Sequence, residues 1–482
     1  MSRAPLKQGE FLVESLALVN QFGETLDISG IVGEFTMSES IHRKFVSGVV
    51  GIVDGLNLLK NYRFTGQEFI RISVKQKEGI GDTAGKLYSI DKTFRVFKAD
   101  TITRPTEKIQ SYLLSLCEPR LFNLRRTRLS RTLRGSYDDM LENVLVNEAK
   151  IPMEEFDHWE ETKPDNFQFI VPNWTVNNII DYCVKESNVG GDTNYRNSMF
   201  FFQTLNGGFR FKSIDEMFAQ EFPVAFSMKP RNSSPTEDMD LNAPGGLNSQ
   251  ILSYRKPQMF DTLRGTVRGA YASHMKVYDP LRKLESEEVY DMEETFKRGK
   301  HLSGFPMIHN GAYEYTFTVE NSVGEGEPPQ YSEVDVDLPP NQHFNAFFIE
   351  ASDMRHSYDD NEDLTAQELF RGKENRDNAT LERIALMEIL SQHRIVVTVP
   401  FRTDMNAGQI IQLSLPSAEP TSEQDTADKL NDDRYLITDL KLVGSPSQLG
   451  GTLTMECVKE SYMDKVENVT PLDNTARPRE IW

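Results

Sequence analysis

The feature that most constrains the fold is a run of alternating apolar and polar residues between about residues 394 and 462. Alternation with a period of two, bounded by turn residues, is typical of half-buried antiparallel strands. A turn at Ala407-Gly408 and a later polar loop interrupt the pattern. The run therefore predicts four strands. They are Arg394–Phe401, Gln409–Leu415, Arg434–Val443 and Thr452–Val458.

The first 115 residues or so show the same alternation and predict a compact antiparallel β domain. A short helix is expected at Leu56–Tyr62 and a loop at Gly79–Gly85. The expected strands are Phe11–Asn20, Glu24–Thr36, Phe45–Asp54, Glu68–Lys75, Lys86–Phe97 and Lys108–Leu116.

The two β-rich ends share an order of signals. Gly66-Gln67 precedes Phe69–Ser73 (FIRIS), and Gly408-Gln409 precedes Ile410–Ser414 (IIQLS). After a loop, Leu87–Asp91 (LYSID) then resembles Arg434–Asp439 (RYLITD). One interpretation is that a β module is duplicated, with one copy at each end of the chain flanking a helical middle. The other is chance similarity between unrelated β modules, because antiparallel domains commonly share turns of this kind.

The middle of the chain predicts two amphipathic helices and a hairpin. Ser136 with Asp139 resembles a capping box, and Thr175 is a plausible N-cap for the second helix. The apolar faces are better explained as core than as a partner groove. They comprise Met140, Leu141, Val144 and Leu145, and then Val176, Ile179, Ile180, Cys183 and Val184, with Trp174 placed to pack on Ile179. Alternating phenylalanines on both sides of Asn206-Gly207 predict a β-hairpin, which makes this part mixed α+β.

The stretch that follows is less regular. Residues 231–248 have the composition of a linker, and a strand at Gln250–Arg255 and a short helix near Gln258–Leu263 are expected after it. Residues 266–279 again look extended. Between Glu320 and Glu374 there are 14 acidic residues and 3 basic ones, which predicts a solvated, partly irregular insertion. A helix is expected over Asn375–Gln392.

The composition limits the kinds of partner and the environment that are expected for this chain. The net charge is −20, from 53 basic and 73 acidic residues, which argues against gripping nucleic acid through its phosphates. The six arginines between Arg120 and Arg134 could form a nucleic-acid patch, but pairing with carboxylates is favoured in so acidic a chain. The cysteines, Cys117, Cys183 and Cys457, are expected to be small buried hydrophobes rather than disulfides. The polar first residues and the lack of a long apolar run predict a chain folded in a cytoplasm without a membrane anchor.

Catalytic signatures are missing. The sequence contains no HExxH, GxxxxGK[ST] or GxSxG motif, and no GxGxxG after a strand. Cysteine spacing gives no zinc site, and His301 and His309 lack a metal-binding pattern. Asp335-Val336-Asp337 and Asp359–Asp363 lack the ligand order of an EF-hand. We therefore predict no enzyme, no cofactor, and no catalytic, cofactor-binding or metal residues. A pair of acids for glycoside hydrolysis stays open, since nothing singles one out.

With these elements assembled, the chain resembles the baseplate hub proteins of contractile-tailed bacteriophages, which are related to phage late-control proteins and to the hub part of type VI secretion spikes. Pro172, Trp174 and Thr175 loosely fit that family's start to a helix before a hairpin. The acidic insertion departs from the compact hubs. The stretches that carry the resemblance are Gly66–Val74, Lys86–Val96, Ser136–Leu145, Val171–Ser187, Phe200–Phe211, Met405–Pro416 and Asp433–Val443.

The resemblance implies an α+β, mainly antiparallel β fold in which two similar tube-type β-barrel domains flank a mixed α+β middle with an acidic insertion. The implied first barrel is 1–117, and the middle is 118–245 plus about 286–375, with the insertion at 320–374. The second barrel is about 246–285 plus 376–465, and 466–482 is a tail.

It also implies a homotrimer whose six barrels form a pseudo-sixfold ring between a hexameric tail tube and a trimeric central spike. Tube or tube-initiator proteins, the tape-measure protein and baseplate wedge proteins are the other implied partners. DNA would pass through the lumen without specific binding. The implied location is the baseplate of the virion, assembled in the host cytoplasm. Two rivals stay open, a cell-wall glycosidase of a tail and a β-rich receptor-binding tail component.

Overall fold

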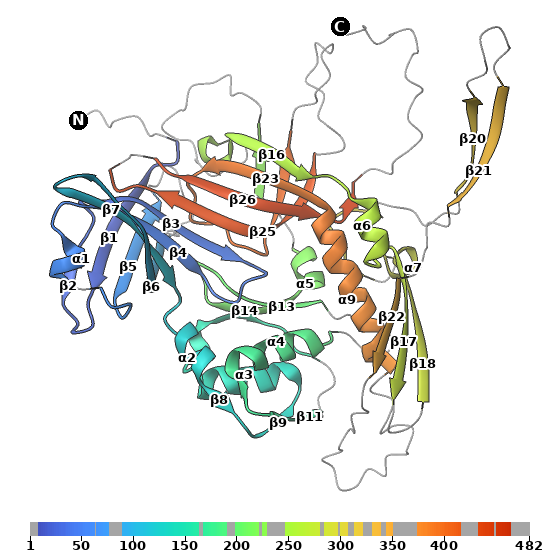
Figure 1. Ribbon diagram of the computed structural model, residues 1–482, viewed down its shortest axis with the longest axis horizontal. Helices are drawn as coiled ribbons and strands as arrows, with labels where there is room; N and C mark the ends of the chain where they lie inside the picture. Colours follow the sequence, from blue (N-terminus) through green and yellow to red (C-terminus); the bar gives the residue numbers. More distant parts are fainter. Residues whose placement is uncertain are drawn as a thin grey trace.

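A computed structural model describes most of the chain (Figure 1). The described residues are 8–62, 64–76, 89–162, 167–189, 198–220, 224–228, 246–279, 284–296, 299–306, 313–321, 330–338, 344–349, 374–415, 432–447 and 450–463.

The N-terminal strands form an antiparallel sheet in the order β1-β5-β6-β7-β4-β3, which we call the first module. Its strands are β1 (Phe11–Val19), β3 (Val32–Ser40), β4 (Ser47–Asp54), β5 (Phe69–Gln76), β6 (Ser89–Thr106) and β7 (Ile109–Cys117). The short β2 (Thr25–Asp27) pairs with β1, and α1 (Leu58–Asn61) follows β4. The expected strand Glu24–Thr36 is wrong as one element, because the amide of Ile31 donates to the carbonyl of Ile28 and this turn separates β2 from β3. The predicted loop Gly79–Gly85 lies outside the described residues.

The C-terminal strands form a second sheet in the order β16-β23-β26-β25-β24-β15, which we call the second module. The four strands predicted near the end of the chain are confirmed. They are joined by two strands from much earlier in the sequence. The six are β15 (Val224–Ser227), β16 (Ser253–Gln258), β23 (His393–Pro400), β24 (Ile410–Ser414), β25 (Asp433–Gly444) and β26 (Thr452–Lys459).

The two modules are one continuous 13-stranded sheet, because β25 of the second module pairs with β3 of the first. Figure 1 shows the blue strands of the first module running into the orange-red strands of the second. The prediction of a mainly antiparallel β protein is confirmed. Among the described strands, the pairing closes neither module into a barrel.

Helices and short strands of the middle region lie below this sheet in Figure 1. The predicted caps are confirmed, since Ser136 Oγ accepts the Asp139 amide at 3.4 Å and Thr175 Oγ1 accepts the Asn178 amide at 3.3 Å. The apolar helix faces and the hairpin share one buried cluster. The elements are α2 (Leu121–Arg126), β8 (Arg128–Leu129), β9 (Thr132–Gly135), α3 (Tyr137–Asn147), the 3-10 turn η1 (Met153–Glu155), β10 (Phe156–Trp159), β11 (Phe167–Ile170), β12 (Trp174–Thr175), α4 (Val176–Glu186), β13 (Met199–Gln203), β14 (Phe209–Ser213) and α5 (Ile214–Phe218).

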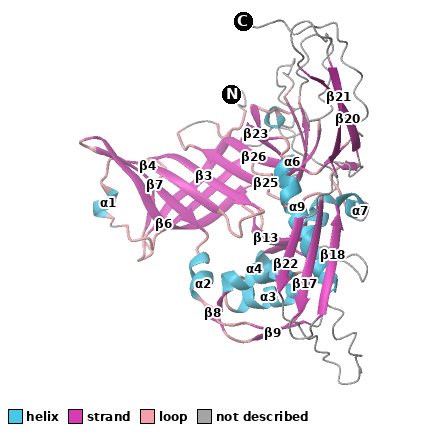
Figure 2. Cartoon of the chain, turned by 45° about the vertical axis from the view of Figure 1, so that its right-hand side comes forward, coloured by secondary structure: helices cyan, strands magenta, loops and turns pink. Residues whose placement is uncertain are grey.

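A long insertion separates β16 from β23, and Figure 2 shows its small sheet beside the long helix α9. Met275 and Tyr290 of that sheet pack with Leu381, Ala385 and Ile389 of the helix. The elements are α6 (Thr262–Val267), β17 (Ala272–Asp279), β18 (Leu284–Asp291), α7 (Met292–Phe296), β19 (Phe305–Pro306), β20 (Tyr313–Asn321), β21 (Gln330–Leu338), β22 (Phe344–Ile349) and α9 (Glu374–Gln392), with η2 (Leu247–Ser249) before β16 and β27 (Ser461–Tyr462) after β26.

The acidic stretch 320–374 is more regular than expected where it is described. Its β21 pairs with β20 and its β22 pairs with β17. Residues 322–329, 339–343 and 350–373 of this stretch lie outside the described residues, as do most of the expected linker 231–248 and the tail 466–482.

The largest buried cluster draws on both modules, including Phe35 and Leu116 from the first and Val397 and Leu442 from the second. The three cysteines are buried free thiols, as predicted. No helix in the described part of the chain is long and apolar enough to cross a membrane.

Candidate functional site: the junction of two matched modules

The two modules have the same strand order. The first pairs as β1-β5-β6-β7-β4-β3 and the second as β15-β24-β25-β26-β23-β16, and within each module the corresponding strands also follow one another along the chain. One polarity differs, because β1 is antiparallel to β5 whereas β15 is parallel to β24. Chance resemblance between unrelated sheets does not account for a shared neighbour order and a shared chain order.

The match extends to individual residues. In β6 the register with β7 shifts between Val96 and Lys98, and in β25 the register with β26 shifts between Ile437 and Asp439. Each shift adds one residue to the longer strand and is a β-bulge. Counting from the bulges superposes Phe69–Ser73 on Ile410–Ser414.

The first predicted match is therefore confirmed, and the second is displaced. Asp91 pairs with Ser73, whose counterpart is Ser414, so Asp91 corresponds to Asp432 and not to Asp439. Alternating strings can be aligned at several offsets with similar patterns, and the two candidate aspartates lie seven residues apart, which is why sequence comparison alone misplaced the match.

Each module turns into its third-from-last strand through a glycine with positive φ. Gly66 has φ 82° and Gly408 has φ 81°, a backbone conformation that glycine adopts without steric cost. The amide of Ile437 donates to the Gln409 carbonyl at 2.9 Å, and the amide of Val96 donates to the Glu68 carbonyl at 2.9 Å. In this register the two glycine turns occupy the same place in each module but are offset by one residue, because Gly66 lies three residues before Phe69 and Gly408 lies two residues before Ile410.

The modules meet where β25 changes partner. Its first residues, 433–436, pair with β24. Beyond the bulge, residues 439–444 pair antiparallel with residues 40–35 of β3 on that same edge. The bulge at Thr438 therefore lets one strand serve two neighbours in succession.

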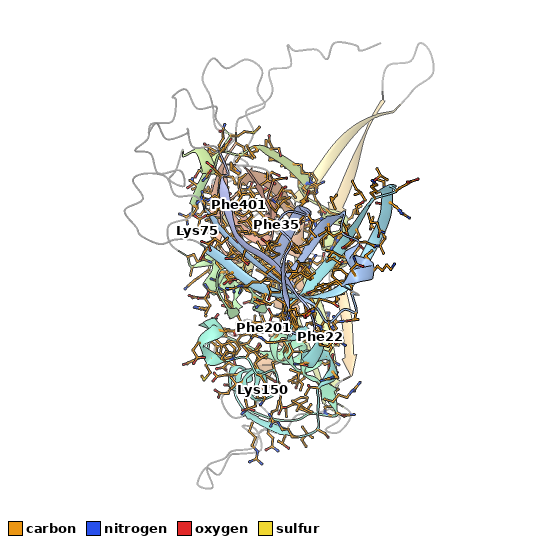
Figure 3. All side chains as sticks on the ribbon, turned by 90° about the vertical axis from the view of Figure 1, so that its left-hand side faces the viewer. Phe22, Phe35, Lys75, Lys150, Phe201 and Phe401 are labelled. Atoms are coloured by element: carbon orange, nitrogen blue, oxygen red, sulfur yellow. The ribbon has the colours of Figure 1, made fainter. Side chains whose placement is uncertain are left out.

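Aromatic rings pack across this junction. Phe11 of β1 stacks on Phe401 at 4.3 Å between ring centroids and meets Phe35 of β3 edge-on at 6.0 Å. Figure 3 labels Phe35 and Phe401 close together in the upper part of the molecule. A Cβ at Gly444 would lie 2.6 Å from Phe35 Cζ, so the absence of a side chain there is what allows the rings to close.

A buried glutamate ties three parts of the chain together. Glu39, at the end of β3, is 2% exposed. One carboxylate oxygen accepts the amide of Ala407, before β24, at 2.5 Å, and the other accepts the amide of Leu205 at the hairpin tip. Burial raises the pKa of Glu39 to about 7, against the opposing effect of the two amide donors.

A second buried charge lies at the opposite end of β25. Lys459 Nζ is 3.2 Å from Asp433 Oδ2, with exposures of 0% and 1%. Ser303 of the insertion donates to the other oxygen of Asp433 at 2.6 Å. Burial, reinforced by the charge of Lys459, lowers the pKa of His393 to about 3, so that ring is neutral. The hydrogen bond from Ser303 to Asp433 therefore connects the insertion to the second module.

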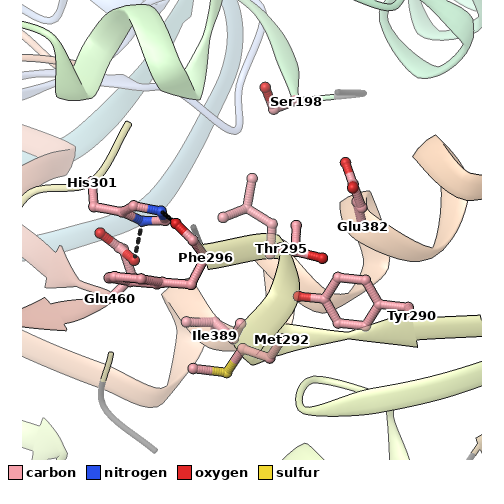
Figure 4. A pocket seen from close by; sticks show the side chains of 10 residues that line it. Ser198, Tyr290, Met292, Thr295, Phe296, His301, Glu382, Ile389 and Glu460 are labelled. Atoms are coloured by element: carbon pink, nitrogen blue, oxygen red, sulfur yellow. Dashed lines mark hydrogen bonds and ion pairs between the residues drawn. The ribbon is translucent and has the colours of Figure 1, made fainter. Parts of the chain in front are cut away.

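One small pocket lies between the insertion, α9 and the start of β13, with about 480 Å³ of space that is partly open to solvent (Figure 4). His301 Nδ1 is 3.0 Å from Glu460, and its Nε2 is 2.6 Å from the carbonyl oxygen of Phe296. A carbonyl can only accept, so Nε2 carries a hydrogen and cannot act as a base there. Ser198 also lines the pocket. The geometry therefore gives His301 a structural role rather than that of a base for a nucleophile.

Two of the six arginines in the arginine-rich stretch pair with carboxylates, as the favoured interpretation predicted, and Arg128 donates to the carbonyl of Asn173. Arg120 pairs with Glu155 at 2.7 Å and with Glu118 at 3.2 Å, and Arg131 pairs with Glu148 at 3.4 Å. Where residues are described, no three metal-ligating side chains gather. His309 and Asp359–Asp363 lie outside the described residues.

No protein-family model matches the sequence, and no curated protein matches it. Solved structures do. A 43 kDa tail protein of prophage MuSo2 from Shewanella oneidensis is 9% identical, over 93% of this chain and 99% of that one, with a TM-score of 0.48. A tail protein from Neisseria meningitidis MC58 is 10% identical, over 94% and 97%, with a TM-score of 0.49.

The E. coli c3393 protein, described as a type VI secretion component similar to the T4 tail proteins gp27 and gp5, is 8% identical over 95% and 79%, with a TM-score of 0.36. These three solved structures are thus proteins of phage tails and of type VI secretion.

Proposed function

We propose that this chain is the structural baseplate hub of a contractile phage tail. Three copies form a pseudo-sixfold ring that joins the hexameric tail tube to the trimeric central spike. The observation that supports this most is the duplication. Two modules with one strand order and one bulge position are joined edge to edge in a continuous sheet. A repeated unit that joins its neighbour through a strand edge is suited to building a closed ring.

Each module corresponds to one tube-type barrel of such a ring. Tube or tube-initiator proteins, the tape-measure protein and baseplate wedge proteins are the further partners, and the protein resides in the virion after assembly in the host cytoplasm. The net charge of −20 supports a channel through which DNA passes without adhering, because acidic walls repel phosphates.

The proposed role involves no catalysis. The engaged nitrogens of His301 support this, as does the pairing of arginines and carboxylates at the described sites above. Turnover of purified peptidoglycan, abolished by a single Asp or Glu substitution, would replace the proposal with a glycosidase.

Native mass measurement tests the assembly directly. We expect trimers of the full-length protein, either alone or with the spike protein of the same tail. A protein that stays monomeric under both conditions would refute the ring. Capture of the tube protein only by the trimer would add support, with the monomeric fraction of the same preparation as its control.

A further inference from the structure

The junction inside the chain is made from two kinds of strand edge. The receiving edge is the part of β25 beyond its bulge, residues 439–444. The donating edge is the side of β3 that faces away from β4. Because the modules are duplicates, each of these edges has a counterpart in the other module.

Neither counterpart pairs with a described strand. The counterpart of the receiving edge is β6 beyond its own bulge, residues 98–106, which pair with β7 on one side only. The counterpart of the donating edge is the outer side of β16, which pairs with β23 alone. Such edges carry unpaired amide and carbonyl groups, and proteins cover, charge or pair them.

We propose that β16 of one copy pairs antiparallel with residues 98–106 of β6 in a neighbouring copy, as β3 pairs with β25 inside the chain. The occupant of each edge is thus a second copy of this chain. Repeating the operation that relates the modules then continues the sheet from subunit to subunit. The inference rests on the proposed ring, and it assigns the strands that close it.

The register across subunits follows from the residues that the modules share. Asp100 lies opposite Leu113 of β7, as Lys441 lies opposite Thr454 of β26. These two positions are equivalent because each lies four residues after the last register before the bulge, at Val96 and Ile437, and each faces a partner three residues along the neighbouring strand.

Gln258 of β16 is placed in the same way. It lies opposite Arg394 of β23, just as Ser38 of β3 lies opposite Ser47 of β4. Gln258 therefore takes the place of Ser38. Inside the chain Lys441 pairs with Ser38. Asp100 therefore pairs with Gln258 of the neighbouring copy. We call this predicted pair the first anchor of the register.

A second anchor, meaning a second predicted pair, lies further along the same strands. Thr103, opposite Ser111, takes the place of Val443. Arg255, opposite Val396, takes the place of Thr36. Val443 pairs with Thr36 inside the chain, so Thr103 pairs with Arg255 of the neighbour.

The two predicted residue pairs, Asp100–Gln258 and Thr103–Arg255, are consistent with a single strand register, and this consistency is the main support for the proposal. Between its anchors β6 has one more residue than β25, because its register with β7 shifts between Asp100 and Thr103. Between its anchors β16 has one more residue than β3, because its register with β23 shifts between Arg255 and Gln258. An extra residue in only one strand would offset the ladder. With one in each, the ladder runs from Asp100–Gln258 to Thr103–Arg255 without an offset.

The same register covers exposed apolar side chains. Phe260 follows the end of β16 by two residues, after a bend at Met259, and Phe97 directly precedes Lys98 of β6, so both rings lie near the end of the proposed ladder. Phe260 is 71% exposed and Phe97 is 50% exposed. Bringing two large rings together removes apolar surface from water, which favours association.

Cysteine pairs test the register in the full-length protein. Directly opposed residues in an antiparallel ladder have Cα atoms about 4.5–5.5 Å apart, within reach of a disulfide. We expect the Asp100→Cys/Gln258→Cys variant to give covalent trimers after mild oxidation, and the Thr103→Cys/Arg255→Cys variant to do the same. Either cysteine alone should give none, since each faces a different residue across the interface.

The matched control is Asp100→Cys/Ser253→Cys, in which the second thiol is shifted along β16 by five residues, about 17 Å at 3.4 Å per residue. Trimers by native mass that cross-link neither anchored pair, or that cross-link the control equally well, would overturn the strand pairing and leave the hub intact. Wild type and variants that are all monomeric, with and without the spike, would overturn the hub and the pairing together.

Discussion

Replacing Glu39 by glutamine probes a buried acid at the junction. The carboxylate is 2% exposed and accepts backbone amides from Leu205 and Ala407, two segments that belong to different parts of the fold. Burial raises its pKa from the ordinary 4.5 to about 7. The native state therefore binds this proton more tightly than the unfolded chain does.

The sign and size of the effect follow from proton linkage. The neutral form stabilises the folded state fully below pH 4.5, and this stabilisation is lost as the pH rises through 7. At 1.36 kcal/mol per pH unit, the loss is about 3 kcal/mol between pH 4.5 and pH 8. Glutamine does not ionise. We therefore expect Glu39→Gln to gain about 3 kcal/mol of opening free energy relative to wild type over that range.

Amide hydrogen exchange measures the quantity at the site itself. Opening free energies are obtained for the amides of Leu205 and Ala407 at pH 4.5 and pH 8, in wild type and in Glu39→Gln, after correction for intrinsic exchange rates. The matched control is Glu34→Gln, an exposed position on the same strand, which should leave the difference from wild type constant. If Glu39→Gln also keeps a constant difference, the carboxylate does not titrate in this range and the reasoning is refuted.

Two further substitutions test the second module. Lys459→Met leaves the buried carboxylate of Asp433 without its cation, so we expect a loss of about 3–5 kcal/mol in urea unfolding, partly restored by adding Asp433→Asn. An unchanged unfolding midpoint would contradict a buried ion pair. Gly408→Ala should lower the melting temperature more than Gly66→Ala, because both have φ near +80° but a Cβ at Gly408 would also meet Phe202 Cζ at 3.0 Å. Equal shifts would show that backbone strain alone matters.

The sequence predicted what local chemistry decides. Alternation located the strands, the hydroxyls of Ser136 and Thr175 marked helix starts, and the turn at Asn206-Gly207 marked the hairpin. The expectation for the acidic stretch rests on its charge, and its period carries a further signal. Residues 330–338 (QYSEVDVDL) do alternate, and they form β21.

Pairing between distant segments could not be predicted in this way. Nothing local marks β15 and β16 as neighbours of strands that follow much later, since an edge is satisfied by any strand of suitable register. The bulge at Thr438 has no glycine or proline to announce it, yet it decides that β25 reaches β3. Glu39 likewise reads as an ordinary polar residue at a strand end, and only the packing of three segments around it changes its pKa.

The duplication would also allow one chain to bind the proposed partners of different symmetry. In the first module residues 41–46 join β3 to β4, whereas residues 259–392 separate the equivalent strands β16 and β23. The strands common to both modules occur twice per chain, and the insertion with α9 and the β17-β18-β22 sheet occurs once. In the proposed trimeric ring the shared strands therefore repeat six times and the insertion three times. In that proposed ring the sixfold set of shared strands would face the tube and the threefold set of insertions would face the spike, so one inserted segment would resolve the mismatch without a second kind of subunit.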